Sequence, residues 1–300
     1  MVNVVRKVGH VIKHSPEIMK NKYVINRLQH QTNFRTISYD NKKSDKIVVS
    51  LTSYKKRFST LSLCLKSIFK QTLLPDKIVL YLSKDEKLSD IPYNVQELQK
   101  FGLEIRFVDL DLKPHKKYYY AMQEFPNDIV ITVDDDVIYN KELIRELYDA
   151  HKKFPNCIVS ARAHEITFED NKISNYNNWH WCSDKIYTPS FLFTATGVGG
   201  ILYPPHLLRL NYLLNLDFIK KYIYVDDLWL KTVELISGVP TVICDQKVDH
   251  KRIDIVSAQD QSLSKVNVVQ NQNDEKLIQL ETDFNLLSKL KISEERLKNG

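Results

Sequence analysis

Short apolar runs alternate with helix-periodic segments along the chain from Lys46 onward. The runs have strand length and many β-branched residues, and they occupy Ile47 to Ser53, Lys77 to Ser83, Leu103 to Leu110, Asp128 to Val133 and 157–163 (CIVSARA). The segments between them with helical spacing of apolar residues are RFSTLSLCLKSIFKQ, HKKYYYAMQEF and about Lys141 to Lys153. We expect Ser59 or Thr60 to cap the first helix and Pro126 to end the second.

This alternation predicts an α/β fold with a mostly parallel central sheet flanked by helices. Short connections and continuous apolar strands are typical of a sheet that is covered on both faces. Ligands of such sheets bind beyond the carboxyl ends of the strands. Thr52 to Tyr54 follow the first strand and Asp134 to Asp136 follow the fourth. The topology therefore predicts that both groups lie on the same rim.

The two ends of the chain differ from this regular middle. Residues 1–45 are polar and basic, and we expect a helical extension there, although the apolar residues are spaced too irregularly to give the bounds of a helix. After residue 165, a Gly-Val-Gly-Gly turn (197–200) is followed by the predicted helix VDDLWLKTVELIS and the predicted strand PTVICD, and the pattern of about the last thirty residues is helical and amphipathic. We therefore expect an N-terminal extension at 1–45, a main domain at 46–255 and a C-terminal helical extension at 256–300.

Composition and charge narrow the choice of partners only slightly. The chain has 300 residues, a hydrophobic fraction of 43%, a net charge of +6 and four scattered cysteines without zinc-like spacing, which predict a soluble protein with free thiols. It lacks an apolar run of about eighteen residues and a signal peptide. The positive charge suits a nucleotide or an anionic membrane surface, and no nucleic-acid-binding motif is present. We expect a cytoplasmic protein whose basic N-terminus touches the inner face of the membrane.

The strongest candidate for chemistry is the run ITVDDDVIY. Three consecutive carboxylates at the end of a buried strand repel one another and are costly to desolvate unless a cation neutralises them. Mg²⁺ or Mn²⁺ binds one or two carboxylates and completes its coordination with water and phosphate oxygens. Asp134 and Asp136 project to one side in an extended chain, which suits a shared ion. The alternative is an acidic loop that caps the following helix.

Four motifs resemble the inverting glycosyltransferases of family 2, which have the GT-A fold. SLTSY is similar to the nucleotide loop of the family, SIFKQT to its S-x-x-x-Q-T segment, VDDDVIYNKELI to its aspartate motif and VDDLWL to its ED motif. The similarity runs from about Lys46 to Asp249. The chain departs from the family at Ser83, where the second strand commonly ends in an acid that contacts the base, and at Asp226, which replaces Glu.

The resemblance implies a nucleotide-sugar-binding half at 46–140 and an acceptor-binding half at 141–255. It implies that the donor binds at the rim formed by the carboxyl ends of the strands. The implied donor-binding residues are Thr52, Ser53, Tyr54, Arg57, Ser83, Lys116, Lys117, Asp134 and Asp135. Mn²⁺ or Mg²⁺ would bind Asp134, Asp136 and His250. Asp227 would be the general base. The implied acceptor-binding residues are Trp181, Gly199, Gly200, Asp226 and Trp229.

Implied partners are a nucleotide-diphosphate sugar donor and a glycan or lipid-linked glycan acceptor, as in capsule or lipopolysaccharide synthesis. Two alternatives from other classes remain open. A phosphatase of the haloacid dehalogenase type would use Asp134 as nucleophile with Asp136 beside it, although such proteins place that strand near the start of the fold. A sugar-binding scaffold without catalysis is the second alternative. The sequence makes no prediction of oligomeric state.

Overall fold

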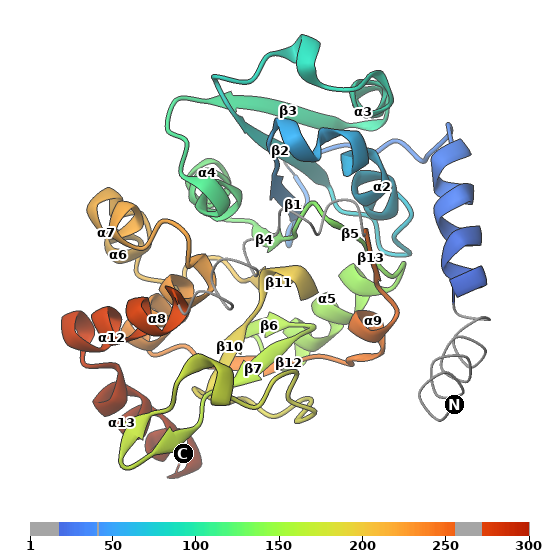
Figure 1. Cartoon of the computed structure of the whole chain (residues 1–300). Coiled ribbons are helices and arrows are strands. Elements are labelled where there is room, and N and C mark those ends of the chain that lie inside the picture. The colour runs from blue at the N-terminus through green and yellow to red at the C-terminus, as the bar shows by residue number, and fades with distance from the viewer. Residues whose placement is uncertain (1–17, 41, 256–271, 300) are drawn as a thin grey trace, which may run out of the picture.

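The computed structural model describes residues 18–40, 42–255 and 272–299. Its centre is a seven-stranded sheet in the order β12-β6-β11-β4-β1-β2-β3, in which only β11 runs antiparallel to its neighbours (Figure 1). In chain order the strands are β1 (Ile47–Thr52), β2 (Lys77–Ser83), β3 (Leu103–Val108), β4 (Ile129–Thr132), β6 (Ile158–Ser160), β11 (Ile201–Tyr203) and β12 (Thr241–Ile243). The predicted α/β fold with a mostly parallel sheet is confirmed.

Short two-stranded ribbons and small helices surround this sheet. The ribbons pair β5 (Val137–Ile138) with β13 (Ile253–Asp254), β7 (Ala163–Glu165) with β10 (Phe193–Ala195), and β8 (Phe168–Glu169) with β9 (Lys172–Ile173). The short helices are α3 (Tyr93–Gln96), α6 (Leu210–Leu213), α7 (Leu216–Lys221) and α9 (Lys247–His250).

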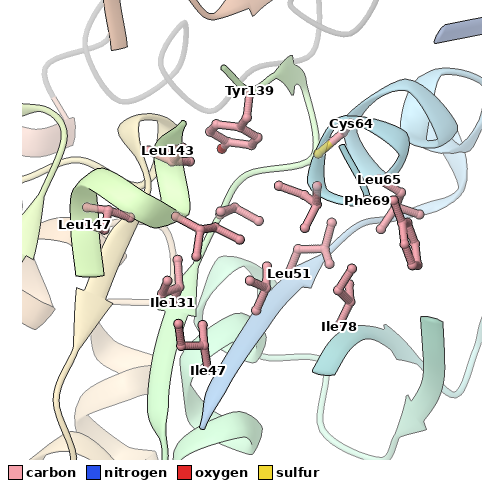
Figure 2. Packing of buried hydrophobic residues seen from close by; sticks show 14 of the residues in the cluster. Ile47, Leu51, Cys64, Leu65, Phe69, Ile78, Ile131, Tyr139, Leu143 and Leu147 are labelled. Carbon is pink, nitrogen blue, oxygen red and sulfur yellow. The ribbon is translucent and has the colours of Figure 1, made fainter. Parts of the chain in front are cut away.

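Helices cover both faces of the sheet, because side chains of each strand point alternately to opposite sides. Ile47, Val49 and Leu51 of β1 pack in one core cluster with α2 (Phe58–Ile68) and α5 (Leu143–Lys153), as Figure 2 shows in part. Val48 belongs to the other cluster, with α4 (Lys116–Glu124) and α8 (Asp226–Ser237). Full burial of one such side chain stabilises the fold by about 1.5–3 kcal/mol.

The predicted helices α2, α4, α5 and α8 all form, but the cap predicted for α2 is wrong. Arg57 occupies the N-cap position and its side chain makes no capping hydrogen bond. Thr60 lies inside the helix, and its hydroxyl donates to the Arg57 carbonyl at 3.1 Å. At the C-terminal end of α8, Gly238 has a φ of +70°, the left-handed conformation that commonly ends a helix.

Residues 18–30 form a helix within the expected N-terminal helical extension, at bounds that the sequence pattern did not give. Leu28 packs with Leu63 of α2 and with Ile255. The buried Lys66 ammonium donates to the carbonyls of Leu28 and Gln29, each at 3.0 Å, in the last turn of this helix, where carbonyls lack the usual intrahelical donors. Tertiary contacts therefore stabilise a segment of weak periodicity. The membrane contact expected from the basic N-terminus falls largely on residues 1–17, outside the described residues.

The predicted C-terminal helices are α12 (Gln272–Phe284) and α13 (Leu286–Asn299), and both contact α8. Glu294 anchors α13, because its Oε2 accepts from the Phe191 amide at 2.8 Å and the Ser190 hydroxyl at 3.1 Å. The four cysteines are free. Across the described ranges, no helix has both the length and the apolar composition needed to cross a membrane.

Trp229 corrects the prediction of an acceptor-binding tryptophan on α8. Its side chain is fully buried, stacks on Tyr222 with ring centroids 5.7 Å apart, and contacts Phe284 of α12 at 5.7 Å. Position 229 lies about one turn further along α8 than Asp226, where the helix packs against Tyr222 and α12 and no longer borders the cavity. Trp229 therefore joins the C-terminal helices to the main domain.

We expect Trp229→Ala to lower the free energy of unfolding by about 3–5 kcal/mol, because it leaves a large cavity in the core. Urea denaturation measures this change. The matched control is Trp181→Ala at a side chain that is 44% exposed, for which we expect a loss of about 1 kcal/mol or less. Equal losses in the two variants would contradict the burial of Trp229 against α12.

Candidate active site

A cavity of about 800 Å³ opens at the carboxyl ends of β1, β2 and β4. Parallel strands bring their ends to one rim, so side chains that are far apart in sequence meet here. The sequence-predicted residues that line the cavity are Thr52, Ser53, Tyr54, Arg57, Ser83, Lys116, Lys117, Asp134, Asp135, Asp136, Trp181, Asp226 and Asp227. The donor-side and acceptor-side predictions therefore share one cavity.

Arg57 at the start of α2 holds two of the three aspartates. Its Nη1 lies 2.5 Å from Asp135 Oδ1 and its Nη2 lies 3.3 Å from Asp136 Oδ2. The Ser53 hydroxyl donates to Asp135 Oδ2 at 2.5 Å. These aspartates do not cap the next helix, because α5 begins only at Leu143. The alternative interpretation as a capping loop is therefore wrong.

Burial and mutual repulsion perturb this acidic cluster. Burial raises the pKa of Asp135 even though the Arg57 guanidinium opposes the shift. Burial, and next the Asp134 carboxylate, raise the pKa of Asp136 to about 7. The cluster thus has less positive charge around it than its three carboxylates would need to stay fully ionised.

Lys117 of α4 joins the acidic cluster to the start of α8. Its ammonium lies 2.7 Å from Asp134 Oδ1 and 3.0 Å from Asp226 Oδ2. Burial alone would lower the Lys117 pKa, but the Asp134 and Asp226 carboxylates outweigh it and raise the pKa well above its usual range. A Cβ at Gly197 would lie 2.6 Å from this ammonium and 2.9 Å from Asp134 Oδ1, so only glycine fits there.

Asp226 and Asp227 occupy the first turn of α8 but differ in environment. Burial would raise the pKa of Asp226, yet the adjacent Lys117 ammonium more than offsets it, and the pKa is lowered. Asp227 accepts a hydrogen bond from the Gly197 amide at 3.2 Å. Burial, and next the Asp226 carboxylate, raise the Asp227 pKa well above its usual range. Asp227 is therefore the better proton acceptor of the two.

Aromatic side chains form the opposite wall of the cavity. The Trp181 ring stacks on His164, with centroids 4.7 Å apart and planes 28° apart, and meets Tyr176 edge-on at 5.9 Å. An exposed indole of this kind can pack against the apolar face of a sugar ring.

Besides Trp229, three predicted site residues do not line the cavity. His250 ends α9 with its side chain exposed to solvent, away from the acidic cluster. Gly199 and Gly200 serve the backbone instead. A Cβ at Gly199 would lie 2.5 Å from the Arg162 Cβ, and Gly200 has a φ of +85°. These positions correct the predicted metal-binding role of His250 and the predicted acceptor contacts of the two glycines.

Other cavity-lining residues were missed by the sequence analysis, among them Glu86, Arg162, His164, Arg252 and Asn273. Arg162 could have been found, because it is a charged residue at the carboxyl end of the apolar run predicted as a strand at 157–163. Asn273 lies in the predicted C-terminal extension, and no local pattern indicates that it reaches the cavity.

The cavity suits a divalent cation that is bound mainly by non-protein ligands. Within the described residues no group of three His, Cys, Asp or Glu side chains is arranged to hold a metal ion. Mg²⁺, however, commonly takes one or two carboxylates and obtains its other oxygens from water and phosphates. The hard oxygens of Asp134 and Asp136 and the raised pKa of Asp136 fit such an ion.

We expect Lys117→Met to lower the free energy of unfolding by about 3–5 kcal/mol, because it leaves the buried Asp226 and the partly exposed Asp134 without their shared cation. Chemical denaturation measures this change. The neighbouring Lys116→Met is the control. Lys116 pairs with the partly exposed Asp111, so its loss should cost about 1 kcal/mol or less. A small effect at Lys117 would contradict its bridging role.

Comparison with known proteins identifies the family of the chain. The crystal structure of S. aureus TarS 1-349 in complex with UDP is 16% identical, with a TM-score of 0.40 over 66% of this chain and 57% of that chain. The present chain thus spans little more than half of that structure, and no curated protein matches it significantly. Residues 48–200, half of the chain, match the model of glycosyl transferase family 2. The chain belongs to glycosyltransferase family 2, and its fold is GT-A.

Proposed function

We propose that this protein transfers a sugar from a nucleotide-diphosphate sugar to an acceptor hydroxyl, with inversion at the anomeric carbon. Family membership establishes a glycosyltransferase. The observation that carries the finer proposal is that one cavity holds both the acidic cluster and Asp227, which Lys117 connects through its contacts with Asp134 and Asp226. The first group suits a donor diphosphate with its cation, and the second suits an acceptor hydroxyl.

In this proposal the donor binds along the rim formed by β1, β2 and β4. Thr52 to Tyr54 and Ser83 would contact the nucleoside. Asp134 and Asp136 would hold Mn²⁺ or Mg²⁺, which, when bound, would stabilise negative charge on the diphosphate. Lys116 lines the same cavity, where it pairs with Asp111. Its ammonium would add positive charge beside the phosphates.

Asp227 would act as the general base. The acceptor oxygen forms a bond to the anomeric carbon, its proton passes to the Asp227 carboxylate, and the bond to the diphosphate oxygen breaks with its electron pair. A carboxylate with a raised pKa holds that proton more firmly than an ordinary one, which favours the transfer. Trp181 would support the acceptor, which we propose to be a glycan or lipid-linked glycan of a surface polysaccharide.

The two earlier alternatives lose their support. Family 2 membership argues against a haloacid dehalogenase phosphatase, and the strand before Asp134 is the fourth of the fold rather than the first. A scaffold without catalysis would not need an Asp227 with a raised pKa beside the Lys117–Asp226 ion pair.

We expect a nucleoside diphosphate to raise the melting temperature more in the presence of Mn²⁺ than without it. Ligand that binds only the native state stabilises it by mass action. Asp136→Asn should remove the metal-dependent part of the shift, whereas Asp217→Asn, at an exposed position on α7, should keep it. A shift that is independent of Mn²⁺ in the wild type would argue against the metal site, and no shift with any nucleotide would argue against the proposed donor.

We expect the turnover of donor and acceptor to fall as the pH is lowered through the raised pKa of Asp227, because the base must be ionised. The midpoint should lie above about 4, the ordinary value for an aspartate. Rates at saturating donor measure this limb. Asp227→Asn should lose about 10²–10⁴-fold in turnover and keep nucleoside diphosphate binding. An acidic limb at the ordinary value, or an active Asp227→Asn variant, would remove Asp227 from the mechanism.

A further inference from the structure

Arg162 is a cavity-lining cation that the proposed function does not yet use. It follows β6 directly, and its carbonyl accepts from the Thr196 amide at 3.1 Å, which ties the backbone to the 3-10 turn at Gly197–Gly199. The absence of a side chain at Gly199 lets the Arg162 Cβ approach this turn closely. The hydrogen bond from Thr196 and the close approach to Gly199 therefore fix the position of Arg162.

The other cations of the cavity are already paired. Arg57 pairs with Asp135 and Asp136, and Lys117 pairs with Asp134 and Asp226. Lys113 and Lys116 pair with Asp111, and Arg252 pairs with Asp249 and Asp254. Each of these ammonium or guanidinium groups balances protein carboxylates.

The positive charge of the Arg162 guanidinium is not balanced by a carboxylate of the described residues. Within residues 18–40, 42–255 and 272–299, no carboxylate lies at ion-pair distance from it, and its Nε is buried without a hydrogen-bond partner. A buried donor without an acceptor is costly, so a site that retains one is adapted to a ligand that supplies the acceptor. A guanidinium matches the paired oxygens of a carboxylate or a phosphate.

The surroundings place this cation on the acceptor side. The Arg162 carbonyl accepts from the Thr196 amide at 3.1 Å and Asp227 accepts from the next amide, that of Gly197, at 3.2 Å, so the arginine and the proposed base border the same turn in the cavity wall. The ring of His164, held neutral because burial and then Arg162 lower its pKa to about 3, supports the exposed Trp181 ring. Asn273, at the start of α12, adds a buried amide to the same cavity.

We propose that Arg162 binds an anionic group of the acceptor, a carboxylate or a phosphate, while the sugar ring that carries it packs against Trp181. This proposal rests on the proposed function, because it assigns the acceptor through its position beside Asp227. It makes the acceptor class acidic sugars or phosphate-bearing sugars. Asn273 donates from its amide to the same acceptor.

The test measures binding of three soluble probes to protein saturated with a nucleoside diphosphate and Mn²⁺. The probes are glucose 6-phosphate, glucuronic acid and methyl glucoside, so the first two arms distinguish a phosphate from a carboxylate. We expect at least one anionic probe to bind about tenfold or more tightly than the neutral one, as a charge-assisted hydrogen bond allows. Arg162→Gln should remove this preference, and Arg162→Lys should retain part of it because the charge remains.

Arg252→Gln is the matched control, because it removes one positive charge from the same cavity at an arginine that is already paired. Thermal melts verify that each variant is folded. Equal weakening by the Arg162 and Arg252 substitutions would show a general field effect and overturn the proposal. Equal binding of all three probes to the wild type would also overturn it.

The outcomes separate this proposal from the function on which it rests. If Arg162→Gln weakens nucleoside diphosphate binding as much as it weakens the anionic probe, the arginine belongs to the donor and the acceptor assignment fails. If the wild type binds no nucleoside diphosphate at all, the proposed transferase mechanism itself fails. If Arg162→Gln binds the nucleoside diphosphate normally but loses the preference for an anionic probe, the result supports both the proposed transferase function and the assignment of Arg162 to the acceptor.

Discussion

The architecture of the site depends on one buried ammonium group. Lys117 lies between Asp134, at the end of β4, and Asp226, at the start of α8, at 2.7 and 3.0 Å. The buried Asp226 carboxylate could not stay ionised without a nearby cation, and the buried Lys117 ammonium could not stay charged without its carboxylate partners. The ion pairs also fix the distance between the donor side and the acceptor side. Gly197 completes the arrangement, because any larger residue would occupy the position of the ammonium.

The same ammonium shifts the pKa values of two adjacent aspartates apart. Asp226 is close to Lys117 and has a lowered pKa, whereas Asp227 points to the Gly197 amide and has a raised pKa. Both lie in the first turn of one helix, so the difference arises from their neighbours and not from the helix dipole, which acts on both. A structural acid and a proposed proton acceptor thus follow each other in the sequence.

Much of the fold follows from patterns in the sequence. Continuous β-branched runs and helix-periodic segments correctly predicted β1 to β4, α4, α5 and α8, because burial on two faces requires those patterns. The bounds of the N-terminal helix at 18–30 could not be predicted, since its stability comes from packing against α2 and from Lys66, which lies far along the chain. The local periodicity of residues 18–30 cannot reveal that Lys66, so far along the chain, donates hydrogen bonds to the end of this helix.

The sequence by itself determined which chemical groups reach the rim. Polar residues that directly follow apolar strands, such as Asp134 to Asp136, must lie at the carboxyl end of a parallel sheet. Only the tertiary structure decided which residues of a similar kind share the cavity and which do not. Trp181 lies in the cavity and Trp229 in the core, because packing between helices sets their exposure. Charge balance was likewise invisible in the sequence, since whether a cation such as Arg162 has a carboxylate partner depends on distances in space.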